Sequence, residues 1–321
     1  MRRSNTSSVL LKHFSNKKIL VTGAAGSIGS ALCRKLAGLK PKKLILVDQD
    51  ETGIFDIYEE LKGKANVDYV VASIRDSQAI FDTFGMYNPD IVYHAAAYKH
   101  VSLMEKYPEE ARKTNVDGLQ NVIDAAIGVK VKKFVFISSD KAVNPTCEMG
   151  RTKKEGEELC LEDKPFGSTK FIVVRFGNVM PSRGSIVPIF QKLITEGKNL
   201  TVTDKKMKRY FMGIYDAVRL VLKATVLGKG GEIMVLDMGE EVYIDSLAKL
   251  MIKLSGKDLK VRYTKPQRGE KFSEELMTEK EKLLAAKKQG IWIIPPKDTS
   301  FGQSDQLVIP IEIGNTKEIT G

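Results

Sequence analysis

Runs of valine, isoleucine and leucine recur through the first 180 residues and alternate with stretches that have helical spacing. The apolar runs occupy residues 17–23, 42–48, 67–73, 89–97, 131–139 and 169–179. Continuous apolar strands between amphipathic helices are typical of a parallel sheet covered by helices on both faces. The sequence therefore predicts an α/β fold built on a doubly wound parallel sheet. In such a sheet, ligands bind beyond the carboxyl ends of the strands.

The pattern changes after residue 180, where glycine, proline and polar loops interrupt the periodicity. We predict a sheet domain over residues 1–180 and a smaller, interleaved and mainly substrate-binding lobe over residues 181–296. A helix and a strand near 213–238 are expected to return to the sheet. Residues 297–321 are expected to form a tail, in which the alternating run "LVIPIEI" fits either an added strand or an arm to a neighbouring chain.

Composition excludes several classes of protein. Three cysteines without a C-x-x-C pair and three histidines without H-E-x-x-H predict neither a disulfide framework nor a metal site. No apolar stretch reaches the about 18 residues of a membrane span, so we expect a cytoplasmic protein without a membrane partner. The net charge of +11 comes from scattered lysines, so no nucleic-acid partner is expected. We interpret this surplus as solvated surface, with a few arginines reserved for a phosphorylated ligand.

A glycine-rich turn lies between the first predicted strand and helix, in "VTGAAGSIGS". Gly23, Gly26 and Gly29 are spaced three apart, and the turn also contains Ser27 and Ile28. Such a turn lets the backbone approach a pyrophosphate at the amino end of a helix. Asp48 ends the second strand, where a carboxylate accepts from ribose hydroxyls and repels the extra phosphate of NADP. The pattern favours NAD, and the alternative is a glycine turn with a chance aspartate.

Two further groups follow later strands of the predicted sheet. Ser73 and Ile74 come after the third strand, where they would flank an adenine. The small side chains in "HAAAYKH" would leave room beside a dinucleotide, although simple packing explains them equally well; they are Ala95, Ala96 and Ala97.

The stretch "SSDKAVNPTCEMGRTKKEGEE" follows the fifth strand and opens a helix. Met149 precedes Lys153 by four residues, so both side chains face the same side of the helix. Many nicotinamide enzymes have tyrosine at the first of these positions, and a thioether cannot carry a proton. Ser139, Asp140 and Lys141 stand together at the carboxyl end of this strand, where proton-carrying side chains would face a ligand. The alternative is a helix-capping turn with a solvated lysine.

Together, the glycine turn, Asp48, "HAAA", "TNVDG", "SSDK" and Lys153 resemble the extended short-chain dehydrogenase/reductases, which implies a Rossmann fold. Five longer blocks across residues 17–278 resemble the polysaccharide-biosynthesis nucleotide-sugar 4,6-dehydratases; they are "HAAAYKHVSLME", "SSDKAVNPTCEMG", "RFGNVMPSRGSIVPIF", "TDKKMKRYFM" and "RGEKFSEEL". Met149 makes the chain similar to the configuration-retaining UDP-N-acetylglucosamine 4,6-dehydratases, since the inverting enzymes have tyrosine. Many relatives carry a membrane-embedded amino-terminal half, and this sequence resembles a stand-alone soluble version. The resemblance also implies a homo-oligomer.

The resemblance implies an internal redox cycle on UDP-N-acetylglucosamine. NAD takes a hydride from carbon 4, water is lost across carbons 5 and 6, and the hydride returns to carbon 6. Asp140 is expected to protonate the leaving hydroxyl, and Lys141 to be the base at carbon 5 with its pKa lowered by burial or by a cation such as Lys153. Lys153 would bind the nicotinamide ribose. Because Met149 has no hydroxyl, we hypothesise that Asp140, assisted by Ser139, also accepts the proton of the carbon 4 hydroxyl.

The family's blocks also imply a set of substrate contacts. Arginine suits a diphosphate because its planar fork makes paired hydrogen bonds. Arg209 and Arg268 would lie near the diphosphate and Glu270 at the uridine ribose. Asn178, Arg183 and Ser185 would meet the phosphates or the sugar, Val179 the nicotinamide, and Lys99 with Thr114 or Asn115 would border both ligands. Any single arginine of this set is equally compatible with ordinary solvated surface.

The sequence leaves three rival functions open. A nucleotide-sugar 4-epimerase shares the fold and ligands, but needs no carbon 5 base and usually keeps the tyrosine. An inverting dehydratase would also change the hand of carbon 5. A catalytically silent NAD-binding scaffold module would explain Met149, but not the intact Ser139, Asp140 and Lys141.

Overall fold

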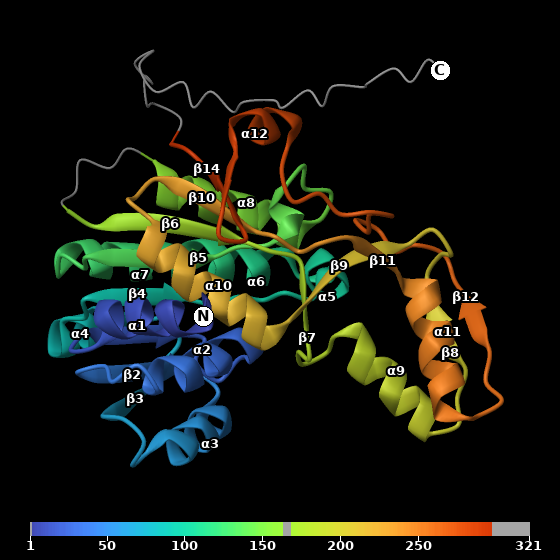
Figure 1. The fold of residues 1–321 in the computed structure, drawn as a ribbon, viewed down its shortest axis with the longest axis horizontal. Helices are drawn as coiled ribbons and strands as arrows, with labels where there is room; N and C mark the ends of the chain where they lie inside the picture. The colour runs from blue at the N-terminus through green and yellow to red at the C-terminus, as the bar shows by residue number, and fades with distance from the viewer. Residues whose placement is uncertain (1, 163–167, 297–321) are drawn as a thin grey trace, which may run out of the picture.

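A sheet of nine strands forms the centre of the molecule (Figure 1). The computed structural model describes residues 2–162 and 168–296, so the predicted tail 297–321 and its alternating run lie outside the described residues. The strand order is β13-β14-β10-β6-β5-β4-β1-β2-β3, and the strands from β10 to β3 are all parallel. The α/β doubly wound fold class predicted from the sequence is confirmed.

The parallel strands coincide with the apolar runs of the sequence. They are β1 (Lys18–Thr22), β2 (Lys43–Asp48), β3 (Val67–Val71), β4 (Ile91–His94), β5 (Lys133–Ile137), β6 (Lys170–Arg175) and β10 (Glu232–Leu236). All four residues of β4 are buried, and the other inner strands are buried over most of their length. Burial on both faces explains why these strands are continuously apolar rather than alternating.

Helices cover both faces of the sheet, and each face has its own core cluster. On one face lie α1 (Arg2–Phe14), α2 (Ser27–Ala37), α3 (Glu51–Leu61) and α10 (Ile214–Leu227). On the other lie α4 (Ser77–Tyr87), α7 (Gly118–Gly128) and α8 (Glu148–Leu161). Shorter elements connect them: α5 (Val101–Lys106), α6 (Pro108–Arg112), a π-helical turn (Lys113–Asp117), a 3-10 turn (Asp140–Ala142) and α12 (Glu279–Leu284).

A smaller lobe projects from the sheet at the right of Figure 1. It contains α9 (Ile186–Thr195), α11 (Ile244–Ser255) and the paired strands β8 (Leu200–Val202) and β12 (Val261–Tyr263). Phe190, Leu200 and Met207 belong to its separate core cluster. A three-stranded sheet of β7 (Asn178–Met180), β9 (Lys208–Gly213) and β11 (Glu241–Tyr243) joins the lobe to the rest.

The last described segment corrects the predicted boundary of this lobe. Residues 286–294 were assigned to the lobe, but β13 (Ala286–Lys288) and β14 (Ile291–Ile294) extend the main sheet. β14 pairs antiparallel with β10, and Ile291 and Ile294 are buried there. An antiparallel strand can cover a sheet edge without a crossover helix, which is why no strand-helix pattern announced it.

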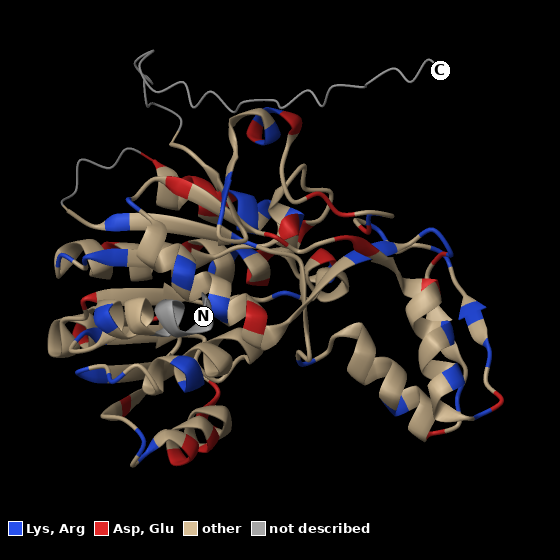
Figure 2. Ribbon diagram, in the orientation of Figure 1, with Lys and Arg blue, Asp and Glu red and all other residues tan. Residues whose placement is uncertain are grey.

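The strand order reverses its direction of growth between β1 and β4. The turns that follow these two strands leave the same edge of the sheet and diverge to opposite faces, which opens a crevice for ligands. Lysine, arginine and acidic residues are interspersed over both parts of the molecule (Figure 2). Among the described residues, no helix has the length and apolar character needed to cross a bilayer, and no three potential metal ligands gather together.

Candidate active site

Two adjoining cavities open at the carboxyl edge of the parallel strands. The first has a volume of about 660 Å³ and lies between the sheet and the lobe. Many of the predicted site residues line it: Gly26, Ser27, Ile28, Gly29, Ala95, Ala97, Lys99, Ser139, Lys141, Met149, Lys153, Asn178, Val179, Arg183, Ser185, Arg209 and Glu270. The second, of about 350 Å³, is lined by Gly23, Asp48, Ile74, Ala96 and Thr114, and shares Gly26, Ala95, Ala97 and Arg183 with the first.

The glycine turn between β1 and α2 forms a backbone cradle beside both cavities. Gly23 has a φ of 70°, and a Cβ there would lie 2.5 Å from the backbone nitrogen of Ala96. A Cβ at Gly29 would overlap the carbonyl oxygen of Gly23. Only glycine lets β1, α2 and the β4 loop approach this closely. The amino end of α2 has no side-chain cap, so its backbone N–H groups remain available to an anion.

Asp48 stands at the end of β2 and lines the second cavity. Its Oδ2 accepts from the backbone N–H of Ala25 at 2.9 Å, and its Oδ1 accepts from that of Asp50 at 3.1 Å. The carboxylate thus ties the glycine turn to the second strand. Each carboxylate oxygen can accept a further hydrogen bond, so the predicted role toward ribose hydroxyls is compatible with this geometry.

Three predicted ligand contacts lie elsewhere than expected. Ser73 lines neither cavity, and its hydroxyl donates to Gln49 at 3.0 Å. Asn115 is also absent from both walls, because its side chain bonds both backbone groups of Tyr98 and the hydroxyl of Thr152. Thr114 was predicted to border both ligands but lines only the second cavity, where Arg75 donates to its hydroxyl. Asn115 therefore braces the wall instead of facing a ligand.

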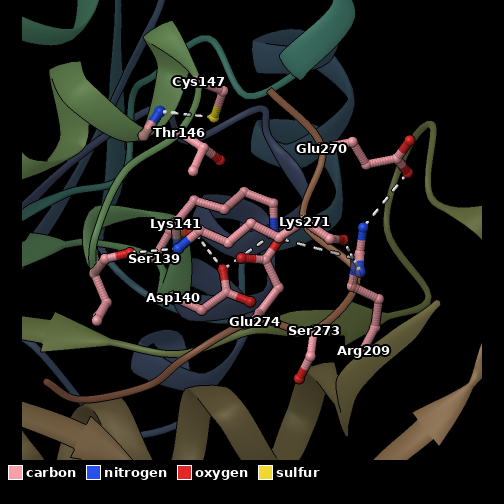
Figure 3. A network of polar contacts seen from close by, with 12 residues as sticks. Ser139, Asp140, Lys141, Thr146, Cys147, Arg209, Glu270, Lys271, Ser273 and Glu274 are labelled. Carbon is pink, nitrogen blue, oxygen red and sulfur yellow. Dashed lines mark hydrogen bonds and ion pairs between the residues drawn. The ribbon is translucent and has the colours of Figure 1, made fainter. Parts of the chain in front are cut away.

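The 3-10 turn after β5 places the predicted acid-base residues side by side (Figure 3). The hydroxyl of Ser139 donates to Asp140 Oδ1 at 2.6 Å, and Lys141 Nζ donates to the same oxygen at 3.2 Å. Ser139 and Lys141 line the first cavity, whereas Asp140 is only 1% exposed and lies behind them. Asp140 Oδ2 is buried without a hydrogen-bond partner. Any proton that Asp140 exchanges with the cavity must therefore pass through a neighbour.

Lys141 lies between two carboxylates. Its Nζ is 3.2 Å from Asp140 Oδ1 and 3.1 Å from Glu274 Oε1 (Figure 3). Burial alone would lower the pKa of Lys141, but the charges of Asp140 and Glu274 outweigh it and the pKa is raised. The lowered pKa that the sequence led us to expect for Lys141 is therefore contradicted. The cation that acts on Lys141 is Arg209 and not Lys153, and it is too weak to reverse the shift.

Met149 and Lys153 both reach the first cavity from α8, as their spacing predicts. Lys153 Nζ donates to the carbonyl oxygen of Ile137 at 2.8 Å and lies 4.6 Å from the centre of the Phe136 ring. Burial lowers the pKa of Lys153 to about 8. The Met149 side chain is buried and brings no proton-carrying group to the wall.

The lobe contributes Arg209, from β9, and Glu270 to the first cavity. Arg209 Nη2 is 3.4 Å from Glu270 Oε1, and Nη1 donates to the carbonyl oxygens of Lys208 and Lys271. These contacts hold the guanidinium in place at the cavity wall. Arg268, predicted beside the same diphosphate, does not line the cavity; its side chain is 93% exposed and its Nε lies 3.8 Å from Glu105.

Glu274 is the site residue that sequence reasoning missed. It lies within the block "RGEKFSEEL", yet nothing in its spacing distinguishes it from the exposed Glu275 beside it. The loop after β12 folds back over the 3-10 turn, and this long-range contact buries the Glu274 side chain to 3% exposure. Tyr98, Thr146, Cys147 and Lys271 are among the other lining residues that were not predicted as site residues.

Comparison with known proteins identifies the family. A family model described as polysaccharide biosynthesis protein matches residues 19–296. The chain belongs to this family. It is 47% identical over 272 residues to the probable polysaccharide biosynthesis protein EpsC of Bacillus subtilis (strain 168), which covers 83% of this chain and 46% of EpsC. The chain spans about half the length of the first curated relatives it matches.

Two further relatives are named as enzymes. The chain is 35% identical over 299 residues to the UDP-N-acetylglucosamine 4,6-dehydratase (inverting) of Campylobacter jejuni subsp. jejuni serotype O:2, covering 90% of this chain and 87% of that protein. It is 36% identical over 292 residues to the UDP-glucose 4-epimerase of Rickettsia prowazekii, covering 88% and 84%. Among solved structures, Pen from Bacillus thuringiensis matches with a TM-score of 0.84 and 39% identity, over 88% of this chain and 90% of Pen.

Proposed function

We propose that the chain catalyses the NAD-dependent 4,6-dehydration of UDP-N-acetylglucosamine to the 4-keto-6-deoxy sugar nucleotide, with retention of configuration at carbon 5. One observation carries the proposal. The Ser139 hydroxyl and the Lys141 amine share a cavity wall with Lys153 and the glycine turn. Proton-transfer groups therefore face the space beside a dinucleotide cradle, as a sugar oxidation followed by an elimination requires.

The residues present fit NAD. The closely packed glycine turn and the uncapped amino end of α2 suit a diphosphate, and Asp48 suits ribose hydroxyls rather than a phosphate. Several solved structures that share the fold contain bound NAD. Bound NAD would supply a reversible hydride acceptor at the first cavity. Lys153, held by the Ile137 carbonyl oxygen, would bind the nicotinamide ribose beside it.

Oxidation at carbon 4 requires a base for the hydroxyl. Ser139 faces the cavity and its hydroxyl already donates to Asp140 Oδ1. The hydroxyl of the sugar can therefore give its proton to Ser139 Oγ as Ser139 passes its own proton to Asp140. The same path in reverse delivers that proton to the leaving hydroxyl of carbon 6. Asp140 serves two steps in this scheme, and Ser139 is its contact with the substrate.

Elimination requires a base at carbon 5, and Lys141 is the candidate on the cavity wall. One group that removes the carbon 5 proton and later returns it acts on a single face of the sugar, so the configuration is retained. Inversion would need a second proton donor on the opposite face. Met149 stands where the inverting enzymes have tyrosine and offers no such donor. This substitution supports retention over inversion.

We assign binding of the UDP part of the substrate to residues of the lobe. Arg209 and Glu270 face the cavity, and an arginine fork suits a diphosphate while a carboxylate accepts from ribose hydroxyls. Substituting Arg209→Ala should weaken binding of UDP by about tenfold or more, while NAD binding changes little. Arg219→Ala on the exposed face of α10 is the matched control. Equal losses of UDP and NAD affinity in titrations of Arg209→Ala would show a folding defect instead.

Two relatives favour neighbouring reactions. The Campylobacter relative is named an inverting dehydratase and the Rickettsia relative a 4-epimerase. A 4-epimerase has no step at carbon 5, so the Lys141 amine at the cavity wall would be unused. A catalytically silent module would explain Met149, but it gives no reason for two proton-carrying side chains that share the carboxylate of Asp140.

The deciding experiment is incubation of the NAD-loaded protein with UDP-N-acetylglucosamine, followed by NMR of the product. We expect a 4-keto-6-deoxy sugar with the original configuration at carbon 5. A product with the opposite configuration would identify an inverting dehydratase, and a sugar altered only at carbon 4 would identify an epimerase. An unchanged sugar, with bound NAD verified in the same sample, would identify the chain as a catalytically silent NAD-binding scaffold module.

A further inference from the structure

Glu274 is a buried acid at the first cavity, and the proposed reaction gives it no role. Its Oε1 is 3.1 Å from Lys141 Nζ and 3.9 Å from Arg209 Nε. Its Oε2 is buried without a hydrogen-bond partner, although the residue lines the cavity. Leaving a buried carboxylate oxygen unpaired costs free energy. A buried acid with a free oxygen, placed against the proposed base, therefore requires an explanation.

Lys141 cannot act as a base while it is an ammonium ion. The two carboxylates beside it stabilise the charged form and raise its pKa. Asp140 is occupied by the Ser139 hydroxyl and by the proton of the carbon 4 hydroxyl in the proposed scheme. Glu274 is the remaining acceptor in direct contact with the lysine.

We propose that Glu274 is the proton store for Lys141. The inference rests on the proposed function. A proton moves along the existing contact from Lys141 Nζ to Glu274 Oε1, so that one N–H bond breaks, one O–H bond forms and the net charge of the pair is unchanged. Lys141 then presents a neutral amine to the cavity, takes the carbon 5 proton and returns it to carbon 5. When the cycle ends, the stored proton moves back to Lys141.

Glu274 suits this role because it contacts Lys141 directly, so the transferred proton stays within the pair. The charged and titratable groups that surround the pair are Asp140 on the 3-10 turn, Arg209 on β9, Cys147 at the start of α8, and Glu270 and Lys271 in the loop itself (Figure 3). Lys271 Nζ donates to the carbonyl oxygen of Val143 and Glu270 pairs with Arg209. Both are thereby occupied, which leaves Asp140 as the rival acceptor.

The proposal predicts a specific pH dependence. In the wild type the ammonium–carboxylate and amine–acid forms of the pair contain the same number of protons, so their ratio does not depend on pH. Removal of the carbon 5 proton should then be flat across neutral pH. In Glu274→Gln the proton of Lys141 must leave to solvent, so the rate should rise about tenfold per pH unit until Lys141 is neutral.

Exchange at carbon 5 isolates this step from oxidation. The 4-keto-6-deoxy product is incubated with the NAD-loaded protein in deuterated buffer, and loss of the carbon 5 proton signal is followed by NMR after subtraction of the uncatalysed rate. We expect a flat wild-type profile and, at neutral pH, an about 100-fold slower exchange in Glu274→Gln with a rising profile. Glu275→Gln is the control, since Glu275 is exposed and bonds only Asn144 among the contacts described.

Three results would overturn the proposal. If the exchange rate of Glu274→Gln does not depend on pH, Asp140 is the acceptor. If the exchange rate of the wild type itself rises tenfold per pH unit, no internal acceptor exists, and this conclusion needs no variant. The second result holds even where Glu274→Gln fails to fold. If the wild type forms no 4-keto-6-deoxy product from the sugar nucleotide, the proposed function fails and the inference with it. If that product forms and the profiles do not differ, only the inference fails.

Discussion

Arg175 holds the helix of the candidate site against the sheet, and its removal should be costly. The residue lies on β6 with a side chain that is 1% exposed. Its Nε and Nη2 donate to the two carboxylate oxygens of Glu157 on α8, at 3.0 and 2.7 Å. Its Nη1 and Nη2 also donate to Glu281 on α12. Glu157 in turn accepts from the hydroxyl of Ser138, next to the 3-10 turn.

The substitution Arg175→Met would leave the Glu157 carboxylate buried without its counter-charge. Breaking a buried ion pair from one side costs about 3–5 kcal/mol, because the remaining charge stays desolvated. Glu281 adds less, since its side chain is 17% exposed and can be hydrated. We therefore expect the free energy of unfolding to fall by about 3–5 kcal/mol. Replacing both partners, with Arg175→Met and Glu157→Met together, should recover most of this loss.

Urea unfolding followed by circular dichroism measures this difference. The matched control is Arg112→Met, because Arg112 makes the same two-bond contact with Glu155 on α8, but with side chains that are 50% and 38% exposed. An exposed pair should cost at most about 1 kcal/mol. A loss below about 1 kcal/mol in Arg175→Met, or equal losses in the two variants, would refute the argument from burial.

Three further outcomes test the site. Gly29→Ala should abolish NAD binding in a fluorescence titration because its Cβ would overlap the Gly23 carbonyl oxygen, whereas Gly85→Ala, which has open space around it, should leave binding intact. Asp140→Asn should reduce turnover about 100-fold or more while NAD stays bound, and near-normal turnover would remove Asp140 from the mechanism. Because burial lowers the pKa of Lys153 to about 8, the unfolded chain binds more protons than the native one between pH 8 and about 10. Wild-type stability should therefore rise with pH in this window relative to Lys153→Met, and parallel urea midpoints would contradict the shift.

The fold and the cofactor side of the site were predictable because their signals are local. Gly23 and Gly29 announce a close backbone approach at the end of an apolar run, and Asp48 ends the next run. Parallel strands bring such ends to one edge whatever the side chains between them do. The same argument placed Ser139 and Lys141 at the cavity and put Met149 and Lys153 on one helix face.

The parts that failed depend on contacts between distant segments. Glu274 reaches Lys141 from a loop about 130 residues along the chain, and no periodicity marks a residue buried by such a contact. Together with the charge of Asp140, its charge reverses the expected direction of the Lys141 pKa. Asn115 was predicted to border the ligands, but its side chain bonds the backbone of Tyr98, and the motif does not show which backbone groups a polar side chain satisfies. β14 was missed because it pairs antiparallel with β10 without a crossover helix, so no strand-helix pattern marks it.

The hydrogen bonds of the 3-10 turn couple the two proposed chemical steps. Ser139 and Lys141 donate to the same oxygen of Asp140. A proton that reaches Asp140 from the carbon 4 hydroxyl therefore neutralises one of the two charges that keep the pKa of Lys141 high. Oxidation at carbon 4 thus makes Lys141 easier to deprotonate just as the new ketone acidifies carbon 5. In the proposed reaction, one shared carboxylate would thus set the order of the two steps in the absence of the tyrosine hydroxyl. Asp140→Asn should then lose oxidation while keeping carbon 5 exchange of the added ketone.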